Sequence, residues 1–121
     1  SEENVYSRNI LVLGDMLELG QEAEQLHRDL STIILSSKIN LVFTFGPLMK
    51  NLFDVLPREL RGYHSNNHHE LAQILIKNIK NNDCVAIKGS SGSQMVKIIE
   101  GLRLFFKEAE VLRDKIIGSS Q

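Results

Sequence analysis

Several residue types are scarce in this chain of 121 residues, and each absence excludes a class of protein. A single cysteine, Cys84, cannot build a disulfide framework, which favours a reducing compartment. No apolar run reaches the roughly 18 residues that a membrane-spanning helix needs. Fourteen Lys and Arg against fifteen Asp and Glu leave a net charge of -1, too little positive charge for a broad nucleic-acid surface. We therefore expect a cytoplasmic protein that binds neither membrane nor nucleic acid.

Apolar segments of strand length alternate with segments of helical periodicity along most of the chain. Strands are predicted at 9–14, 41–45, near 62–64 and at 84–88, and the first and last are apolar enough to be buried on both faces. Helices are predicted at 21–37, 47–56, 67–80 and from about 94. Strands that alternate with helices predict an α/β fold, a three-layer sandwich around a mostly parallel sheet.

This pattern also divides the chain. Residues 1–8 are polar and are interpreted as the remnant of a linker, 9–106 as one α/β domain, and 107–121 as a helical tail that ends in disorder. The chain starts with Ser1 rather than methionine, so we expect a fragment of a longer protein.

Two loops that follow predicted strands carry reactive side chains. The first begins at Gly14 and contains Asp15 and Glu18; the second begins at Lys88 and continues as Gly89-Ser-Ser-Gly-Ser. Because loops after parallel strands lie at one edge of a sheet, the two loops should be neighbours. Free N–H groups at the start of the helix that follows the second loop, together with Lys88, could hold an anion. The alternative is that glycine and serine only cap that helix while Lys88 extends into solvent.

Neither loop matches a common nucleotide motif. In the second loop the lysine precedes the glycine, so the Gly-x-x-x-x-Gly-Lys-Ser/Thr pattern of a phosphate-binding loop is missing. The first loop has only one glycine of a Gly-x-Gly-x-x-Gly dinucleotide fingerprint.

The histidines and the cysteine carry weaker signals. His27 lies beside the apolar stripe of its predicted helix and could bond a ligand carboxylate or a loop carbonyl, or simply border the core. His64, His68 and His69 lack an acidic or cysteine partner at ligand spacing, so we interpret them as exposed surface without a metal. Cys84 is predicted to be inert core.

Two stretches carry a resemblance to a known family. Residues 13–28, Leu-Gly-Asp-Met-Leu-Glu-Leu-Gly-Gln-Glu-Ala-Glu-Gln-Leu-His-Arg, are similar to a signature of Mur ligase C-terminal domains. Residues 85–95, Val-Ala-Ile-Lys-Gly-Ser-Ser-Gly-Ser-Gln-Met, resemble that family's Lys-Gly-Ser loop. The order and spacing of the elements also agree over residues 8–102.

The resemblance implies a Rossmann-like domain of an ATP-dependent, ADP-forming ligase. The branch of the family that it resembles adds D-Ala-D-Ala to UDP-MurNAc-tripeptide during synthesis of peptidoglycan precursors. ATP and Mg²⁺ would be bound mainly by a central domain that this chain lacks, so the isolated domain should be inactive, with no catalytic residue of its own. Its expected role is to bind the dipeptide and to close over the other substrates.

The resemblance also implies roles for individual residues. Asp15 matches an acidic residue that faces the nucleotide, with Glu18 in the same loop. Lys88, Gly89 and Ser90 match the loop that borders the incoming substrate, and His27 matches the family's Leu-His pair. Ser91 stands where many relatives carry Arg or Asn, so an anion contact from that arginine is missing or is supplied elsewhere.

Two other interpretations stay open at this point. The chain could be a stand-alone α/β ligand-binding or regulatory module, although a receiver would need an aspartate at the end of its third strand and residues 62–65 contain none. An independent nucleotide-binding oxidoreductase is disfavoured because the dinucleotide fingerprint is absent.

Overall fold

The computed structural model describes residues 8–15, 23–89, 97–102 and 104. Within these residues the strands are β1 (Arg8–Gly14), β2 (Leu41–Phe45), β3 (Arg61–Ser65) and β4 (Asp83–Lys88). The helices are α1 (Ala23–Leu35), α2 (Lys50–Val55) and α3 (His68–Asn78), with a short 3-10 turn, η2 (Arg58–Leu60), before β3. Residues 97–102 and 104 are also helical.

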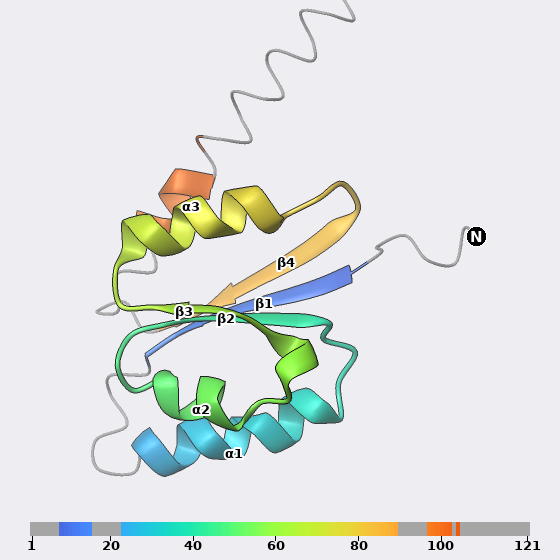
Figure 1. Cartoon of the computed structure of the whole chain (residues 1–121), viewed down its shortest axis with the longest axis vertical. Coiled ribbons are helices and arrows are strands. Elements are labelled where there is room, and N and C mark those ends of the chain that lie inside the picture. Colours follow the sequence, from blue (N-terminus) through green and yellow to red (C-terminus); the bar gives the residue numbers. More distant parts are fainter. Residues whose placement is uncertain (1–7, 16–22, 90–96, 103, 105–121) are drawn as a thin grey trace, which may run out of the picture.

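The strands of the described sheet are all parallel and lie in the order β3-β2-β1-β4. Figure 1 shows α1 and α2 on one face of this sheet and α3 with the helical residues 97–102 on the other. The predicted three-layer α/β sandwich with a parallel sheet is therefore confirmed.

Each face of the sheet has its own apolar core, because successive residues of a strand point to opposite faces. The core under α3 is built from Ile10, Val12, Phe43, Phe45, Leu71, Leu75, Ile98 and Leu102. The core under α1 and α2 is built from Leu13, Ile34, Val42, Met49, Leu52 and Leu56. Burial on both faces explains why β1 and β2 are apolar at almost every position.

β4 differs from the prediction of a strand buried on both faces. Val85 and Ile87 pack against the core under α3, but Ala86 and Lys88 are exposed and Cys84 is only half-buried. The reason is positional: β4 lies at the end of the described sheet, and the core under α1 and α2 draws no described residue from it. The prediction of Cys84 as fully buried core is therefore wrong.

Some element boundaries also differ from the predicted ones. β1 begins at Arg8, which the sequence pattern had assigned to the linker. α2 begins at Lys50 rather than at Pro47, and α3 ends at Asn78. In α1, Ile33 is 63% exposed, whereas the neighbouring Ile34 is 4% exposed and belongs to the core.

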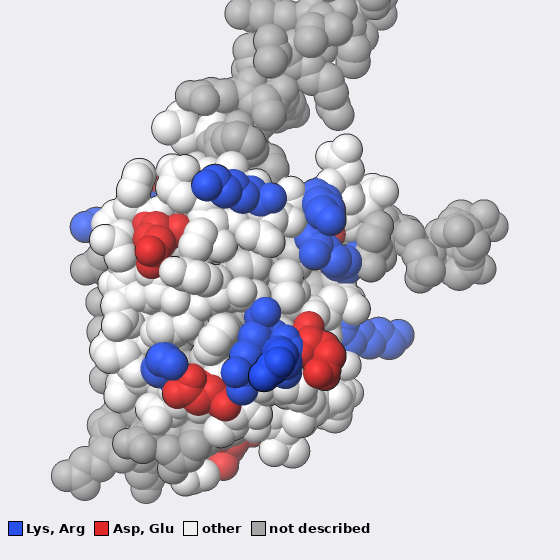
Figure 2. Space-filling view, viewed as in Figure 1, with Lys and Arg blue, Asp and Glu red and all other residues white. Residues whose placement is uncertain are grey.

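Charged side chains of both signs are interspersed on the face drawn in Figure 2. This face carries no single-sign field among the described residues, in keeping with the near-neutral net charge. Among the described helices, none has the length and apolar character required to cross a membrane.

Gly62 sets the pairing of β3 with β2. The register shifts between Val42 and Phe43, so that Val42 pairs with Arg61 and Phe43 with Tyr63. A Cβ atom at position 62 would lie 2.7 Å from the ring of Phe43. The absence of a side chain at Gly62 therefore leaves room for the fully buried Phe43 ring.

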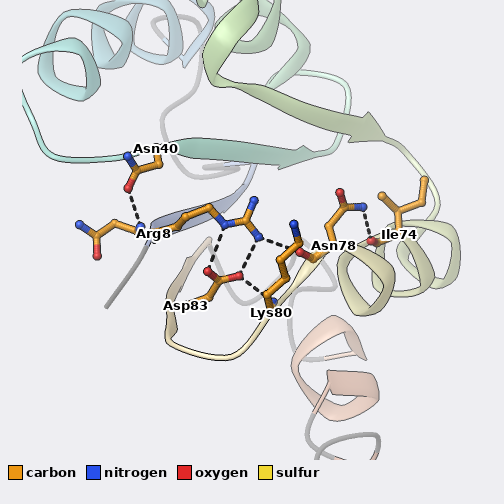
Figure 3. Close-up of polar contacts among 7 residues, drawn as sticks. Arg8, Asn40, Ile74, Asn78, Lys80 and Asp83 are labelled. Carbon is orange, nitrogen blue, oxygen red and sulfur yellow. Dashed lines mark hydrogen bonds and ion pairs between the residues drawn. The ribbon is translucent and has the colours of Figure 1, made fainter. Parts of the chain in front are cut away.

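An ion pair joins the amino-terminal ends of β1 and β4 (Figure 3). Arg8 donates from Nε to Asp83 Oδ1 at 3.1 Å and from Nη2 to Asp83 Oδ2 at 2.7 Å. The same guanidinium donates to the backbone carbonyl of Asn78, the last residue of α3, at 2.8 Å. Asp83 also accepts from the backbone N–H of Lys80 at 2.7 Å, so one carboxylate ties together β1, β4 and the turn between α3 and β4.

The Arg8–Asp83 pair shifts the pKa of the Asp83 carboxyl. The Asp83 side chain is 1% exposed, and hydrogen bonds from Arg8 hold the pKa of its carboxyl below the usual value. Because the folded-state pKa is depressed, this stabilisation is complete above about pH 4 and is lost as the pH falls through the folded-state pKa.

We expect Asp83→Ala to lower the free energy of unfolding by about 2 kcal/mol at pH 7, because it removes charge-assisted hydrogen bonds to Arg8 and Lys80. Asp54→Ala is the matched control. Asp54 pairs with Lys50 at 2.7 Å, but both side chains are 55% exposed, so we expect a loss of only about 0.5 kcal/mol or less. Urea denaturation measures both, and equal losses would contradict the assignment of Asp83 as an anchor.

Candidate functional site

The carboxyl ends of the strands form one edge of the sheet, and the two loops singled out from the sequence start there. Leu13 pairs with Lys88 across β1 and β4, and Gly14 pairs with Phe45 across β1 and β2. Asp15 directly follows β1, and Gly89 directly follows β4. The strand ends from which the two loops start therefore lie side by side. Residues 16–20 and 90–93 of the loops lie outside the described residues, so the adjacency of the whole loops stays a prediction.

Asp15 is buried at this edge and caps a turn that is distant in sequence. Asp15 is only 2% exposed. Oδ1 accepts from the backbone N–H of Met49 at 2.8 Å, and Oδ2 accepts from that of Leu48 at 3.2 Å. Met49 is the N-cap residue of α2 and makes no side-chain capping bond of its own. Asp15 therefore satisfies N–H groups that the start of α2 would otherwise leave without a helical partner.

Gly46 is shaped to fit this carboxylate. Its φ of +105° is a backbone conformation that favours glycine. A Cβ atom at this position would lie 2.5 Å from Cγ of Asp15. Backbone hydrogen bonds extend the strand pairing past the strand ends. The Asp15 N–H donates to Phe45 O, and the Gly46 N–H donates to Ser65 O, each at 3.1 Å. The Gly46 turn and Asp15 thus form one structural unit.

His64 joins the same edge through Thr44. Thr44 is fully buried on β2, and its Oγ1 lies 2.7 Å from Nδ1 of His64, its partner in the β2–β3 register. The other ring nitrogen, Nε2, lies 3.2 Å from Oδ1 of Asn66. An amide oxygen only accepts, so Nε2 carries the proton and Nδ1 accepts from the Thr44 hydroxyl. This pairing fits the neutral imidazole.

Burial is the main reason that the pKa of His64 lies below its ordinary value. Lys50 lowers this pKa further, while the hydrogen bond with Asn66 and the charges of Asp15 and Asp54 oppose the shift. The interpretation of His64 as exposed surface is wrong. It is half-buried because β3 turns it towards Thr44 and the ring of Phe53, whose centroid lies 5.9 Å away.

The end of β3 is closed by a second capping network. Asn67 is the N-cap of α3, and its Oδ1 accepts from the N–H of Glu70 at 2.9 Å. The buried Ser65 hydroxyl donates to Glu70 Oε1 at 2.6 Å and accepts from the N–H of Asn67 at 3.0 Å. These bonds fix the turn where β3 gives way to α3.

Lys88 and Gly89 are both exposed at the edge, beside the Asp15 unit. No ion pair links Lys88 to another described residue. The ammonium group therefore stands at the end of β4 as a positive charge available to an anion.

The other predicted site residues lie partly or wholly outside the described part of the chain. Glu18, Ser90 and Ser91 are outside the described residues. His27 falls within α1, but its side chain is not described. Their roles stay predictions.

The sequence pattern alone does not identify Thr44, Gly46 and His64 as parts of this edge. A threonine inside an otherwise apolar strand was the available signal, because a buried hydroxyl requires a hydrogen-bond partner. The identity of that partner depends on the β2–β3 register, which the sequence does not reveal.

The described residues do not form a metal site. They contain no group of three or more His, Cys, Asp or Glu side chains that could hold a metal ion.

The fit between Asp15 and Gly46 predicts coupled effects on stability. We expect Asp15→Ala to lower the free energy of unfolding by about 2 kcal/mol, because it leaves N–H groups of Leu48 and Met49 without their acceptor. Gly46→Ala should also destabilise the fold, through its φ and the clash with the carboxylate. In the Asp15→Ala background this clash disappears. The double variant should therefore lose about 1 kcal/mol less stability than the sum of the two single losses.

Urea denaturation of the two single variants and the double variant measures this coupling. Asp15→Asn, which keeps one acceptor oxygen and the side-chain volume, is the matched control and should lose less stability than Asp15→Ala. Strict additivity in the cycle would show that Asp15 and Gly46 act independently.

The lowered pKa of His64 predicts a pH dependence of stability. Folding favours the neutral ring, so the contribution of His64 is complete above about pH 6.5 and is lost as the pH falls from 6.5 through the folded-state pKa. We expect His64→Gln to remove this loss between pH 7 and about pH 5, as measured by urea denaturation. His69→Gln, an exposed position on α3, should keep the loss seen in the parent. An identical pH profile for His64→Gln and the parent would refute the prediction.

Comparisons with known proteins point to one family. The model of the family described as Mur ligase, glutamate ligase domain, matches residues 2–91. The UDP-N-acetylmuramoyl-tripeptide--D-alanyl-D-alanine ligase of Bacillus subtilis (strain 168) is 32% identical over 100 residues, which cover 80% of this chain and 22% of that protein. The protein of the same name from Rickettsia prowazekii (strain Madrid E) is 30% identical over 89 residues, covering 74% of this chain and 20% of its own.

A solved structure shares the fold. The crystal structure of MurF ligase from Thermotoga maritima in complex with ADP matches with a TM-score of 0.61 and 25% identity, over 85% of this chain and 22% of that one. The chain thus spans about a fifth of the length of the relatives it matches. On the family match over most of its length, this chain belongs to the family of Mur ligase glutamate ligase domains.

Proposed function

We propose that this chain is the C-terminal domain of an ATP-dependent ligase that adds D-Ala-D-Ala to UDP-MurNAc-tripeptide in peptidoglycan precursor synthesis. The observation that carries the proposal is the register of β1 with β4, which brings Asp15 and Lys88 to adjacent strand ends. Relatives that carry this ligase name are 32% and 30% identical over 80% and 74% of the chain. The domain binds the incoming dipeptide and closes over the other substrates.

The edge offers groups that suit a dipeptide. D-Ala-D-Ala presents a carboxylate, which an exposed ammonium such as that of Lys88 can pair with. Gly89, directly after it, is exposed and has no side chain that would keep an anion away from the backbone. In this proposal Ser90 and Ser91 extend the same anion site, and Glu18 and His27 face the substrates from the first loop and α1.

Asp15 contributes to this site by holding backbone groups in place. Its carboxylate is buried and holds Leu48 and Met49, so it fixes the Gly46 turn beside the loop that follows β1. In this proposal Asp15 positions the Gly46 turn and the loop that follows β1 on the side of the site that faces the nucleotide. A rigid edge matters because small displacements of positioning groups reduce rates strongly.

ATP and Mg²⁺ belong to the longer protein in this proposal. The described residues offer no metal-holding cluster, so we derive no step of phosphoryl transfer from this chain. The isolated chain should therefore lack ligase activity. The parent enzyme would work in the cytoplasm on its UDP-linked precursor. A stand-alone binding module is the alternative, and the activity assay below distinguishes the two.

Phosphate release by the full-length parent tests the function. Release that requires both UDP-MurNAc-tripeptide and D-Ala-D-Ala is the expected result. Release with a single amino acid such as D-Glu, and none with the dipeptide, would reassign the chain to a sister ligase. Absence of release with any of these acceptors would favour the stand-alone module.

In the same assay we expect Lys88→Ala to raise the KM for D-Ala-D-Ala by about tenfold or more, since it removes a charge-assisted contact to the dipeptide carboxylate. Lys77→Ala is the matched control, because Lys77 is exposed on α3 and is not at the sheet edge. An unchanged KM in Lys88→Ala, with both variants folded, would remove Lys88 from the site.

A further inference from the structure

A groove lies between α3 and the helical residues 97–102 and 104, on the face of the sheet that α3 covers. The two helical segments meet at small side chains, since a Cβ atom at Gly101 would be 3.5 Å from that of Ala72. Ile98 and Leu102 fix the second segment, because both belong to the core under α3. The groove has a volume of about 340 Å³, which suits a small molecule rather than a folded partner.

Part of the groove is apolar. Its apolar lining consists of Ala72, Ile76, Gly101 and Leu104. Ala72 is 6% exposed, whereas Leu104 is 61% exposed. An apolar group that covers Leu104 and Ile76 would remove their surface from water, which favours binding.

The polar lining carries charge of one sign. It consists of His68, His69, Gln73 and Lys97, and no described Asp or Glu lines the groove. Lys97 is exposed and forms no ion pair with another described residue. The imidazole rings of the two histidines add N–H donors. Together these groups complement an anion such as a carboxylate.

The cationic and the aliphatic groups lie at opposite ends of the groove. His68 comes about one helical turn before the close contact of the two segments, and so does Lys97 on the second segment. Ile76 and Leu104 come about one turn after this contact. The two segments follow parallel strands, β3 and β4, and cover the same face of the sheet, so they run in the same direction. A ligand with an anionic end and an apolar end therefore matches the groove.

We propose that this groove binds a small amphipathic carboxylate. Its anionic group lies beside Lys97 and the two histidines, and its apolar chain covers Ile76 and Leu104. The groove contains neither Asp15 nor Lys88, so this inference does not rest on the proposed function.

Titration of the 121-residue chain with sodium octanoate, followed by ¹H–¹⁵N NMR, tests the proposal. We expect saturable shifts of the backbone signals of Ala72, Gly101 and Leu104, with a Kd of about 5 mM or tighter. Octanol has the same chain without the charge, and at equal concentration it should cause shifts several-fold smaller. Acetate, which has the charge without the chain, should cause no saturable shift over the same range.

Substitutions at the two ends test the orientation. We expect Lys97→Ala to raise the Kd for octanoate by about tenfold, because it removes the charge that faces the carboxylate. Lys77→Ala is the matched control, since Lys77 is exposed on α3 but does not line the groove. Leu104→Asp should also weaken binding, because it places a negative charge where the apolar chain lies.

Each arm of the experiment can contradict the proposal. Shifts that do not saturate, or that map away from the groove, would overturn it. Equal responses to octanoate and octanol would overturn the recognition of an anion. Equal affinities of Lys97→Ala and Lys77→Ala would remove Lys97 from the site, and an unchanged Kd in Leu104→Asp would overturn the orientation.

Discussion

The buried strand β1 is held at both ends, and the candidate site depends on this double attachment. At its amino end, Arg8 is bound by the Asp83 carboxylate and by the last turn of α3. Beyond its carboxyl end, Asp15 holds the turn before α2. A shift of one residue in the pairing would exchange the two faces of the strand, so the apolar cores on both sides resist any slip. The carboxyl ends of β1 and β4 therefore keep a fixed relation to each other.

The polar groups at the carboxyl edge are organised mainly to satisfy the backbone. Asp15 caps α2, while Ser65 and Asn67 close the start of α3. Such capping bonds stabilise the elements and hold the described residues of this edge in place. A preorganised edge suits a domain that presents a small polar substrate to chemistry carried out by the rest of a longer protein. Lys88 differs from these groups because its exposed ammonium is not taken up by an ion pair with a described residue.

β4 shows how position in a sheet overrides apolar composition. Its sequence, Asp-Cys-Val-Ala-Ile-Lys, is apolar at four consecutive positions, as in β1. Yet among the described residues only its face towards α3 is packed, because the described helices on the other side cover the strands up to β1. Local composition reports how much apolar surface a strand has, and the neighbours of the strand decide how much of that surface is buried.

The alternation of apolar runs with helical repeats determined the α/β class, the parallel sheet and the adjacency of the strand ends from which the two loops start, because these follow from periodicity and from the rules that connect parallel strands. The Asn67 cap was also readable, since capping depends on residues three positions apart. Only the tertiary structure decided that Asp15 would cap Leu48 and Met49, or that His64 would turn inward to Thr44. These contacts join residues 20 to 34 positions apart, and their geometry depends on strand register and helix placement, which no local pattern encodes.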